Sequence, residues 1–129
     1  MLAEFRDYLK TLNVASNYYI GKMDNSKEKT LGVYSQPYVA RVEAIGKESS
    51  YDVAGFRLLL HWNKDARETE AVARELYSKI RYIADTDMDD IHVYFISLDS
   101  GEPTAIGTDD NGVYEYHIAG IIYYRREKE

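Results

Sequence analysis

The sequence has no cysteine, only two prolines and no long hydrophobic run. Without cysteine, disulfide bonds and thiol chemistry are excluded, and nothing ties the protein to an oxidising compartment. The apolar stretches fall far short of the roughly 20 residues that a membrane-spanning helix needs. No signal-peptide pattern opens the chain. We therefore expect a protein without a membrane partner.

Charge and aromatic content narrow the class of protein further. The 129 residues carry 22 acidic and 16 basic side chains, and the net charge of -6 argues against nucleic-acid binding as the main task. Thirteen tyrosines stand against three phenylalanines and one tryptophan. Tyrosine suits half-buried sheet faces and protein interfaces, so its surplus indicates a contact surface. The length predicts a single domain, residues 1–129.

The stretch from Asp65 to Ala84 has the pattern of an amphipathic α-helix. Its apolar stripe at helical spacing consists of Val72, Ala73, Leu76, Ile80 and Ile83. Asp65 is a favourable N-cap, and Glu68 follows three residues later, as in a capping box. We expect the helix to stop at the polar run Asp85–Asp90 and to cover the sheet face that bears Phe56.

The rest of the chain predicts strands, preceded by a short amphipathic helix that ends near Asn13. The expected strands are Tyr18–Met23, Thr30–Ser35, Tyr38–Ile45, Tyr51–Trp62, Ile91–Leu98, Thr104–Thr108 and Val113–Arg126. The polar loop Asp24–Lys29 suits a hairpin, and Gly120 marks a possible β-bulge. The expected fold class is α+β, with a single antiparallel or mixed sheet packed by one long amphipathic helix and a short N-terminal helix.

A search for catalytic or metal-binding patterns finds no specific signal. The run Asp85–Asp90 alternates like a calcium loop, but the glycine and glutamate positions of an EF-hand hold Asp90 and Ile96, which favours a solvated connection. The histidines are His61, His92 and His117, and none pairs at metal-ligand spacing within an element. Neither a nucleophile elbow nor a phosphate loop occurs. We predict no enzyme, cofactor or metal, although a carboxylate pair without a sequence pattern stays open.

Two segments near the start of the chain resemble a known family. Tyr19–Asp24 reads Tyr-Ile-Gly-Lys-Met-Asp, and Lys29–Ser35 reads Lys-Thr-Leu-Gly-Val-Tyr-Ser. This pattern resembles the first hairpin of small head–tail proteins of long-tailed bacteriophages, often labelled minor capsid proteins or tail terminators. The order of elements is similar too, with Phe56–Trp62 leading into Asp65–Ala84 and a closing strand that contains Gly120–Tyr124.

The resemblance implies a structural virion component rather than an enzyme. Such proteins form a ring, usually hexameric, at the head-proximal end of the tail tube and join the tail to the capsid connector. The implied partners are further copies of the chain, the tail tube protein and the head connector protein. DNA would pass through the ring without specific binding, as the acidic balance of the chain allows. Such a virion protein is made in the bacterial host cytoplasm, from a phage or a prophage.

Contacts in this family come from loops and exposed strand edges, which gives a set of candidate interface residues. They are Asn25, Lys27, Lys29, Asp99, Glu102, Asp110, Asn111, Tyr114 and Tyr116. Solvated hairpin tips are an equally good interpretation of the loops among them. The closing strand Val113–Arg126 has one acidic residue and no proline over Val113–Ala119, which is typical of an exposed edge without protection. It has apolar bulk on both faces. One face can serve the core, and the N-terminal helix or neighbouring copies would cover the other.

Two other classes of protein stay open. One is a monomeric module that binds a peptide or a small molecule across the tyrosine-rich sheet face. The other is a small hydrolase without a recognisable signature. A ring component should self-associate or bind tube protein, whereas a binding module should stay monomeric and present a concave apolar pocket.

Overall fold

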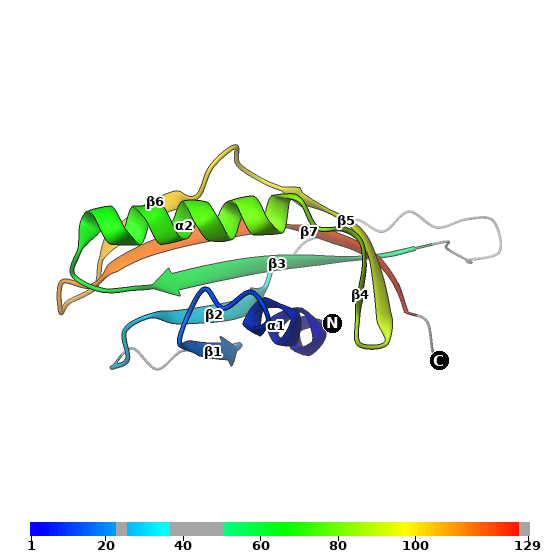
Figure 1. Cartoon of the computed structure of the whole chain (residues 1–129), viewed down its shortest axis with the longest axis horizontal. Coiled ribbons are helices and arrows are strands. Elements are labelled where there is room, and N and C mark those ends of the chain that lie inside the picture. Colours follow the sequence, from blue (N-terminus) through cyan, green and yellow to red (C-terminus); the bar gives the residue numbers. More distant parts are fainter. Residues whose placement is uncertain (23–25, 37–50, 127–129) are drawn as a thin grey trace.

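The structure is a computed structural model that describes residues 1–22, 26–36 and 51–126 (Figure 1). Its two helices are α1 (Leu2–Lys10) and α2 (Ala66–Arg81). Its strands are β1 (Asn17–Ile20), β2 (Thr30–Ser35), β3 (Asp52–His61), β4 (Ala84–Met88), β5 (Ile91–Leu98), β6 (Thr104–Thr108) and β7 (Tyr114–Arg126). All seven strands belong to one mixed sheet, so the fold class is α+β. The expected strand Tyr38–Ile45 lies outside the described residues.

The sheet is built around its longest strand, β7. Strand order is β1-β2-β3-β7-β5-β4, and β6 pairs with the first part of β7. β3 therefore pairs along one side of β7, while β6 and β5 follow one another along its other side. The expectation that this closing strand forms an exposed edge is wrong, because β7 has partners on both sides. Within the described residues, the strands at the edges of the sheet are β1, β4 and β6.

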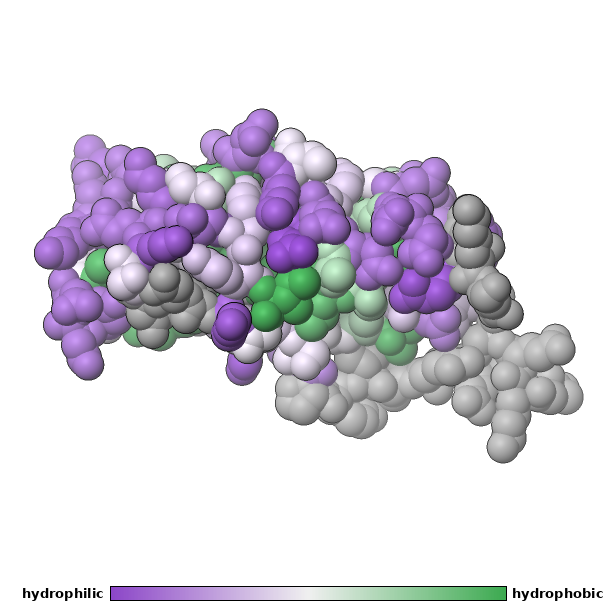
Figure 2. Space-filling view, turned by 90° about the horizontal axis from the view of Figure 1, so that it is seen from below, coloured by the Kyte–Doolittle hydropathy of each residue, from purple (hydrophilic) through white to green (hydrophobic). Residues whose placement is uncertain are grey.

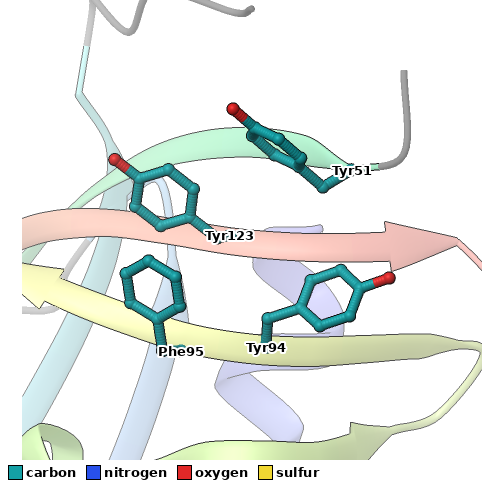
Figure 3. Close-up of a pocket in the computed structure, with 4 residues that line it drawn as sticks. All are labelled: Tyr51, Tyr94, Phe95 and Tyr123. Atoms are coloured by element: carbon teal, nitrogen blue, oxygen red, sulfur yellow. The ribbon is translucent and has the colours of Figure 1, made fainter. Parts of the chain in front are cut away.

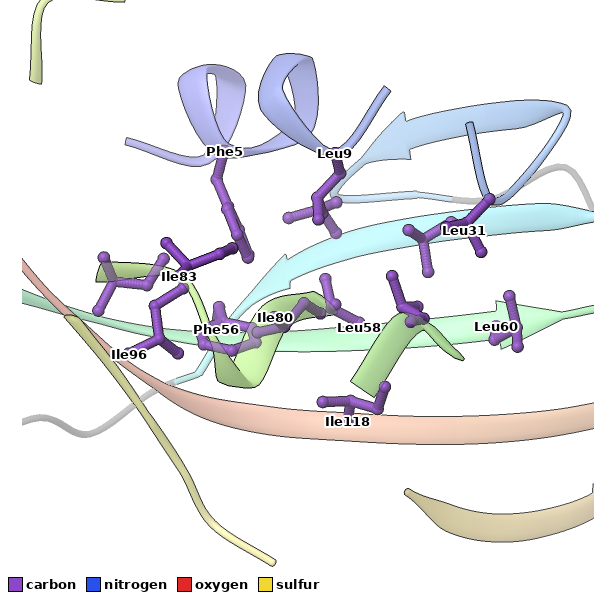
Figure 4. Close-up of a cluster of buried hydrophobic side chains, with 14 of the residues drawn as sticks. Phe5, Leu9, Leu31, Phe56, Leu58, Leu60, Ile80, Ile83, Ile96 and Ile118 are labelled. Carbon is purple, nitrogen blue, oxygen red and sulfur yellow. The ribbon is translucent and has the colours of Figure 1, made fainter. Parts of the chain in front are cut away.

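Both helices pack on the same face of the sheet (Figure 4). The buried side chains that meet there include Phe5 and Leu9 of α1, Ala73, Leu76 and Ile80 of α2, and Leu31, Val33, Phe56, Leu58, Leu60, Ile118 and Ile122 of the strands. The rings of Phe5 and Phe56 meet edge to face with their centroids 5.0 Å apart. The prediction that the face bearing Phe56 is covered is thus confirmed. No helix in the described part of the chain is long and apolar enough to cross a membrane.

The first turn of α2 is tied to the end of β3. Asp65 caps the helix as predicted, because its carboxylate accepts a hydrogen bond from the Glu68 N–H at 3.1 Å. The Glu68 carboxylate does not complete a capping box. It accepts hydrogen bonds from the Trp62 indole at 2.8 Å and from the Asn63 side chain at 2.6 Å. The helix ends at Arg81, before its predicted end.

β1 and β2 do not form the expected hairpin. They pair in parallel, with Asn17 opposite Thr30 and Ile20 opposite Val33. Both strands therefore begin at the same end of the sheet. A polar composition predicts a loop between them, but it says nothing about the direction in which the next strand runs.

The predicted solvated connection after α2 is in fact an edge strand, β4. It forms a hairpin with β5, in which Met88 pairs with Ile91. Met88 is buried, and Asp89 in the turn has φ 56°, a left-handed conformation that aspartate tolerates. Aspartate is rare in strands, so the alternating aspartates of this segment hide its extended structure in the sequence.

Gly120 serves close packing rather than a bulge. It pairs with Phe56 of β3, and a Cβ at this position would overlap the carbonyl oxygen of Ser97 and lie 3.1 Å from the Phe56 ring. Only glycine therefore lets β3, β5 and β7 approach so closely here. The register shifts lie elsewhere, at Tyr94 in β5 and at Ile106 in β6.

We expect Leu76→Ala to lower the free energy of unfolding by ~2–5 kcal/mol, because it leaves a cavity between α2 and the sheet. Ser78→Ala, at an exposed position of the same helix, is the matched control and should change the free energy by less than about 0.5 kcal/mol. Urea unfolding monitored by circular dichroism measures both. Equal effects of the two substitutions would contradict the packing described above.

Gly120→Ala should destabilise the protein by about 1–3 kcal/mol, because the added methyl group needs a shift of the β5 backbone. Gly101→Ala is the control, since a Cβ at Gly101 meets no atom within 4 Å. The two midpoints of thermal unfolding test the difference. A Gly120→Ala protein as stable as Gly101→Ala would show that the three strands are less tightly packed than the structure describes.

Candidate functional site

The sheet face opposite the helices carries an aromatic groove (Figure 3). Tyr51, Tyr94, Phe95 and Tyr123 line a hollow of about 550 Å³. The Phe95 and Tyr123 rings stack with their centroids 4.5 Å apart, and the Tyr51 and Tyr123 rings are 5.9 Å apart. The register shift in β5 explains the groove, since the extra residue brings the consecutive Tyr94 and Phe95 to one face.

Two arginines stand beside tyrosines on this same face. The Arg125 guanidinium lies 5.7 Å from the Tyr94 ring centroid and donates a hydrogen bond to the Tyr94 hydroxyl at 3.1 Å. The Arg57 guanidinium lies 5.5 Å from the Tyr34 ring centroid, and burial raises the pKa of the Tyr34 hydroxyl. Tyrosine and arginine are enriched at protein interfaces, so the composition of this face fits a contact surface.

A buried histidine, His61, lies at the end of β3. His61 is fully buried, contrary to the usual surface position of an isolated strand histidine. Its Nδ1 lies 2.9 Å from a Glu115 carboxylate oxygen, while its Nε2 has no hydrogen-bond partner and lies 3.7 Å from an Asp109 oxygen. Hydrogen bonding from the Val113 N–H lowers the pKa of the Asp109 carboxyl, and His61 acts in the same direction. The histidine and the two carboxylates thus hold the β6–β7 turn against β3.

The other two histidines have different surroundings. His92 Nδ1 lies 2.7 Å from an Asp87 oxygen, and this hydrogen bond raises the pKa of the imidazole. Burial lowers the pKa of His117. Within residues 1–22, 26–36 and 51–126, no group of three or more histidine, aspartate and glutamate side chains could hold a metal ion.

The candidate interface residues occupy two regions of the structure, and Asn25 lies outside the described residues. Lys27, Lys29, Asp110, Asn111 and Tyr114 lie at the end of the sheet where β2 begins and β3 ends. Asp99, Glu102 and Tyr116 lie beside the β5–β6 connection.

Backbone hydrogen bonds connect the first of these regions. The Lys29 N–H donates to the Trp62 carbonyl at 2.8 Å, and the Trp62 N–H donates to the Tyr114 carbonyl at 3.0 Å. The Lys29 ammonium lies 5.7 Å from the centroid of the Trp62 ring. Residues far apart in the sequence therefore meet at this end. The exposed side chains of Lys27 and Asp110 flank the connection.

The second region is divided between the two faces of the sheet. Asp99 accepts a hydrogen bond from the Gln36 side chain at 3.2 Å. Tyr116 packs against the core on the helix-covered face, where it lines a hollow of about 150 Å³ with Glu102 and Arg74. Tyr116 therefore lies on the face opposite to the aromatic groove. These candidates do not form one surface with the groove.

Sequence reasoning missed the groove residues as a group, although the surplus of tyrosine pointed to a contact face. Alternation along β7 placed Tyr123 on one face, but only strand order shows that Tyr51 and Phe95 are its neighbours.

Figure 2 shows a further face of the molecule, which is mainly hydrophilic with a smaller hydrophobic patch near its middle.

The sequence of the chain matches a known protein family. Residues 6–122 match the family described as "Bacteriophage tail terminator protein". The chain belongs to this family. The matched range begins within α1 and ends within β7, so it includes most of the described fold. No curated protein matches the chain.

Membership confirms the resemblance found in the sequence. Tail terminator proteins are structural, so the chain has a structural role in a phage tail and belongs to the virion. Such a role implies contacts with other tail or head proteins. The groove, the exposed strand edges and the loops at the end of the sheet are therefore candidate contact sites of a tail terminator.

Asp87→Asn should lower the pKa of His92 towards its ordinary value of 6.5, because it removes the carboxylate that favours the imidazolium. Because the pKa of His92 is raised in the folded protein, the Asp87–His92 bond stabilises the β4–β5 hairpin fully at pH values below the ordinary pKa of histidine. This stabilisation is lost as the pH rises through the raised pKa of His92. NMR titration of the imidazole measures the shift. Asp89→Asn, in the exposed turn of the hairpin, is the control and should leave the pKa of His92 above that of the Asp87→Asn protein.

Proposed function

We propose that copies of this chain, each folded as one domain, form a ring at the head-proximal end of the tail tube and join the tail to the capsid connector. The observation that carries the proposal is the family match over residues 6–122. A hexamer is the number of copies implied by the resemblance to other head–tail proteins. The partners are further copies of the chain, the tail tube protein and the head connector protein.

The surfaces of the molecule support a role in assembly. The open sheet face offers aromatic rings and two arginines, and three strands have an edge without a described neighbour. We also propose contacts through the candidate loops, among them Asn25, Lys27, Lys29, Asp110 and Asn111. The net charge of -6 would let DNA move through the ring without binding to it.

In this proposal the chain has no catalytic activity. Two of the three histidines have a carboxylate partner on a neighbouring strand. His61 and Glu115 join β3 to β7, and His92 and Asp87 join β5 to β4. Their burial and hydrogen bonds are explained by the packing of the sheet alone. The virion location, from a phage or a prophage, follows from the same proposal.

One observation favours a second function, a monomeric module that binds a peptide or a small molecule. The aromatic groove has a volume of about 550 Å³, which is within the usual range of about 300–1,000 Å³ for ligand sites. Its lining is almost entirely aromatic, with tyrosine hydroxyls as the polar groups. A ligand there would stack on the pair formed by Phe95 and Tyr123.

Electron microscopy of the protein added to purified tail tubes, together with its solution mass at high concentration, tests the ring. We expect rings at one end of the tubes, with self-association that increases in their presence. Tubes incubated without the protein provide the control. A strict monomer that binds neither tube protein nor connector protein would contradict the proposal and favour the binding module.

A further inference from the structure

The edges of the sheet differ in how well they could accept another strand. β4 carries Asp85 and Asp87 with exposed side chains, and Asp85 has φ 46°, which interrupts the extended backbone. Charged side chains and backbone irregularities are the usual means by which proteins prevent edge pairing. The β4 edge is therefore protected against the addition of a strand.

The β1 and β6 edges have no such charge, and the backbone irregularity of β6 is confined to its register shift at Ile106 and to Gly107, with φ 115°. β1 reads Asn-Tyr-Tyr-Ile and β6 reads Thr-Ala-Ile-Gly-Thr, without a charged residue in either. All residues of β6 are exposed, and Ile106 has 53% of its surface accessible although it is a large apolar residue. An uncharged, exposed edge is a template for pairing with another chain.

The backbone of both strands has groups that point away from the sheet. The N–H of Asn17 in β1 donates to the carbonyl of Lys29, just before β2, and the N–H of Gly21, just after β1, donates to the carbonyl of Val33 in β2. Because the direction of backbone groups alternates along a strand, those of Tyr18 and Ile20 point to the open side. The N–H of Asp109, just after β6, donates to the Val113 carbonyl, so the backbone groups of the preceding Thr108 point outward. No other described strand pairs with either edge.

The directions of the strands make these two edges complementary. The row β1-β2-β3-β7-β6 has β1 at one end and β6 at the other. β1 is parallel to β2, whereas each following pair in the row is antiparallel. Counting along the row, β6 runs opposite to β1. A second copy placed beside the first, without being turned over, therefore presents its β1 antiparallel to the β6 of its neighbour.

We propose that β6 of one copy pairs in an antiparallel manner with β1 of the next copy, so that the sheets of adjacent copies become continuous. The proposal rests on the proposed ring and names the surface that closes it. The contact is heterologous, because different edges meet, and heterologous contacts close into a ring when the rotation between copies permits. The register shift at Ile106 increases the twist of β6 and thereby contributes to this rotation.

The absence of cysteine makes cross-linking a direct test. Tyr19 pairs with Gly32, and Thr104 pairs with His117, which places both on the face away from the helices. Tyr19→Cys is combined with Thr104→Cys, and in a second variant with Ile106→Cys to sample the register. Oxidation on tail tubes should give a ladder of reducible oligomers, since Cα atoms of paired strands lie within disulfide reach of about 4.4–6.8 Å. Thr86→Cys on β4 with Thr104→Cys is the control and should give none.

A charge placed on the edge gives a second, independent measurement. Ile106→Lys should weaken self-association by at least about tenfold, because a lysine on an edge strand opposes pairing. The unfolding midpoint of the isolated chain should stay unchanged, since Ile106 is exposed. Thr86→Lys on the β4 edge is the matched control and should assemble like the unmodified protein.

The outcomes separate the edge pairing from the ring itself. Rings that form without β1–β6 cross-links, and that tolerate Ile106→Lys, would overturn the pairing and leave the proposed function standing. Failure of the unmodified chain to assemble on tubes would overturn both proposals. Cross-links that appear equally with the Thr86→Cys control would also overturn the pairing, because they would show unspecific contact.

Discussion

The fold depends on the close approach of three strands at Gly120. β7 receives β3 along one side and both β5 and β6 along the other, and no side chain at this position could fit beneath the Ser97 carbonyl and the Phe56 ring. Glycine at this position accommodates the close contact between the central strands. The helices can then cover one continuous apolar face, because Phe56, Ile118 and Ile122 lie on the same face of the sheet. Within the described residues, neither helix packs on the opposite face.

The sequence predicted those parts of the fold in which local pattern and final environment agree. The stripe that includes Leu76 gave α2, and its N-cap Asp65 was predicted because helix capping is a local interaction. Two predictions were wrong because the features depend on contacts that lie outside the segment itself. The direction of β1 is decided by its pairing with β2, and β4 is a strand because Met88 reaches the core despite neighbouring aspartates.

The candidate site could be predicted only in part, for a related reason. The surplus of tyrosine indicated a contact face, yet the groove exists because strand order brings Tyr51 to Tyr123 and because one extra residue in β5 turns Tyr94 and Phe95 to the same side. Such a register shift has no sequence pattern. The buried pairing of His61 with Glu115 likewise follows from the register of β3 and β7, which the sequence of either strand alone does not contain.

The double-sided pairing of β7 also has a consequence for how the fold would resist a pulling force. Pulling β7 along its own axis would load the hydrogen bonds of two ladders in shear, and its ladder with β3 extends from Asp52 to His61. β1, which pairs on one side from Asn17 to Ile20, could instead be peeled away bond by bond. Under load, the molecule should yield at its margins before its centre, so the central strands would keep their geometry while the margins absorb the strain.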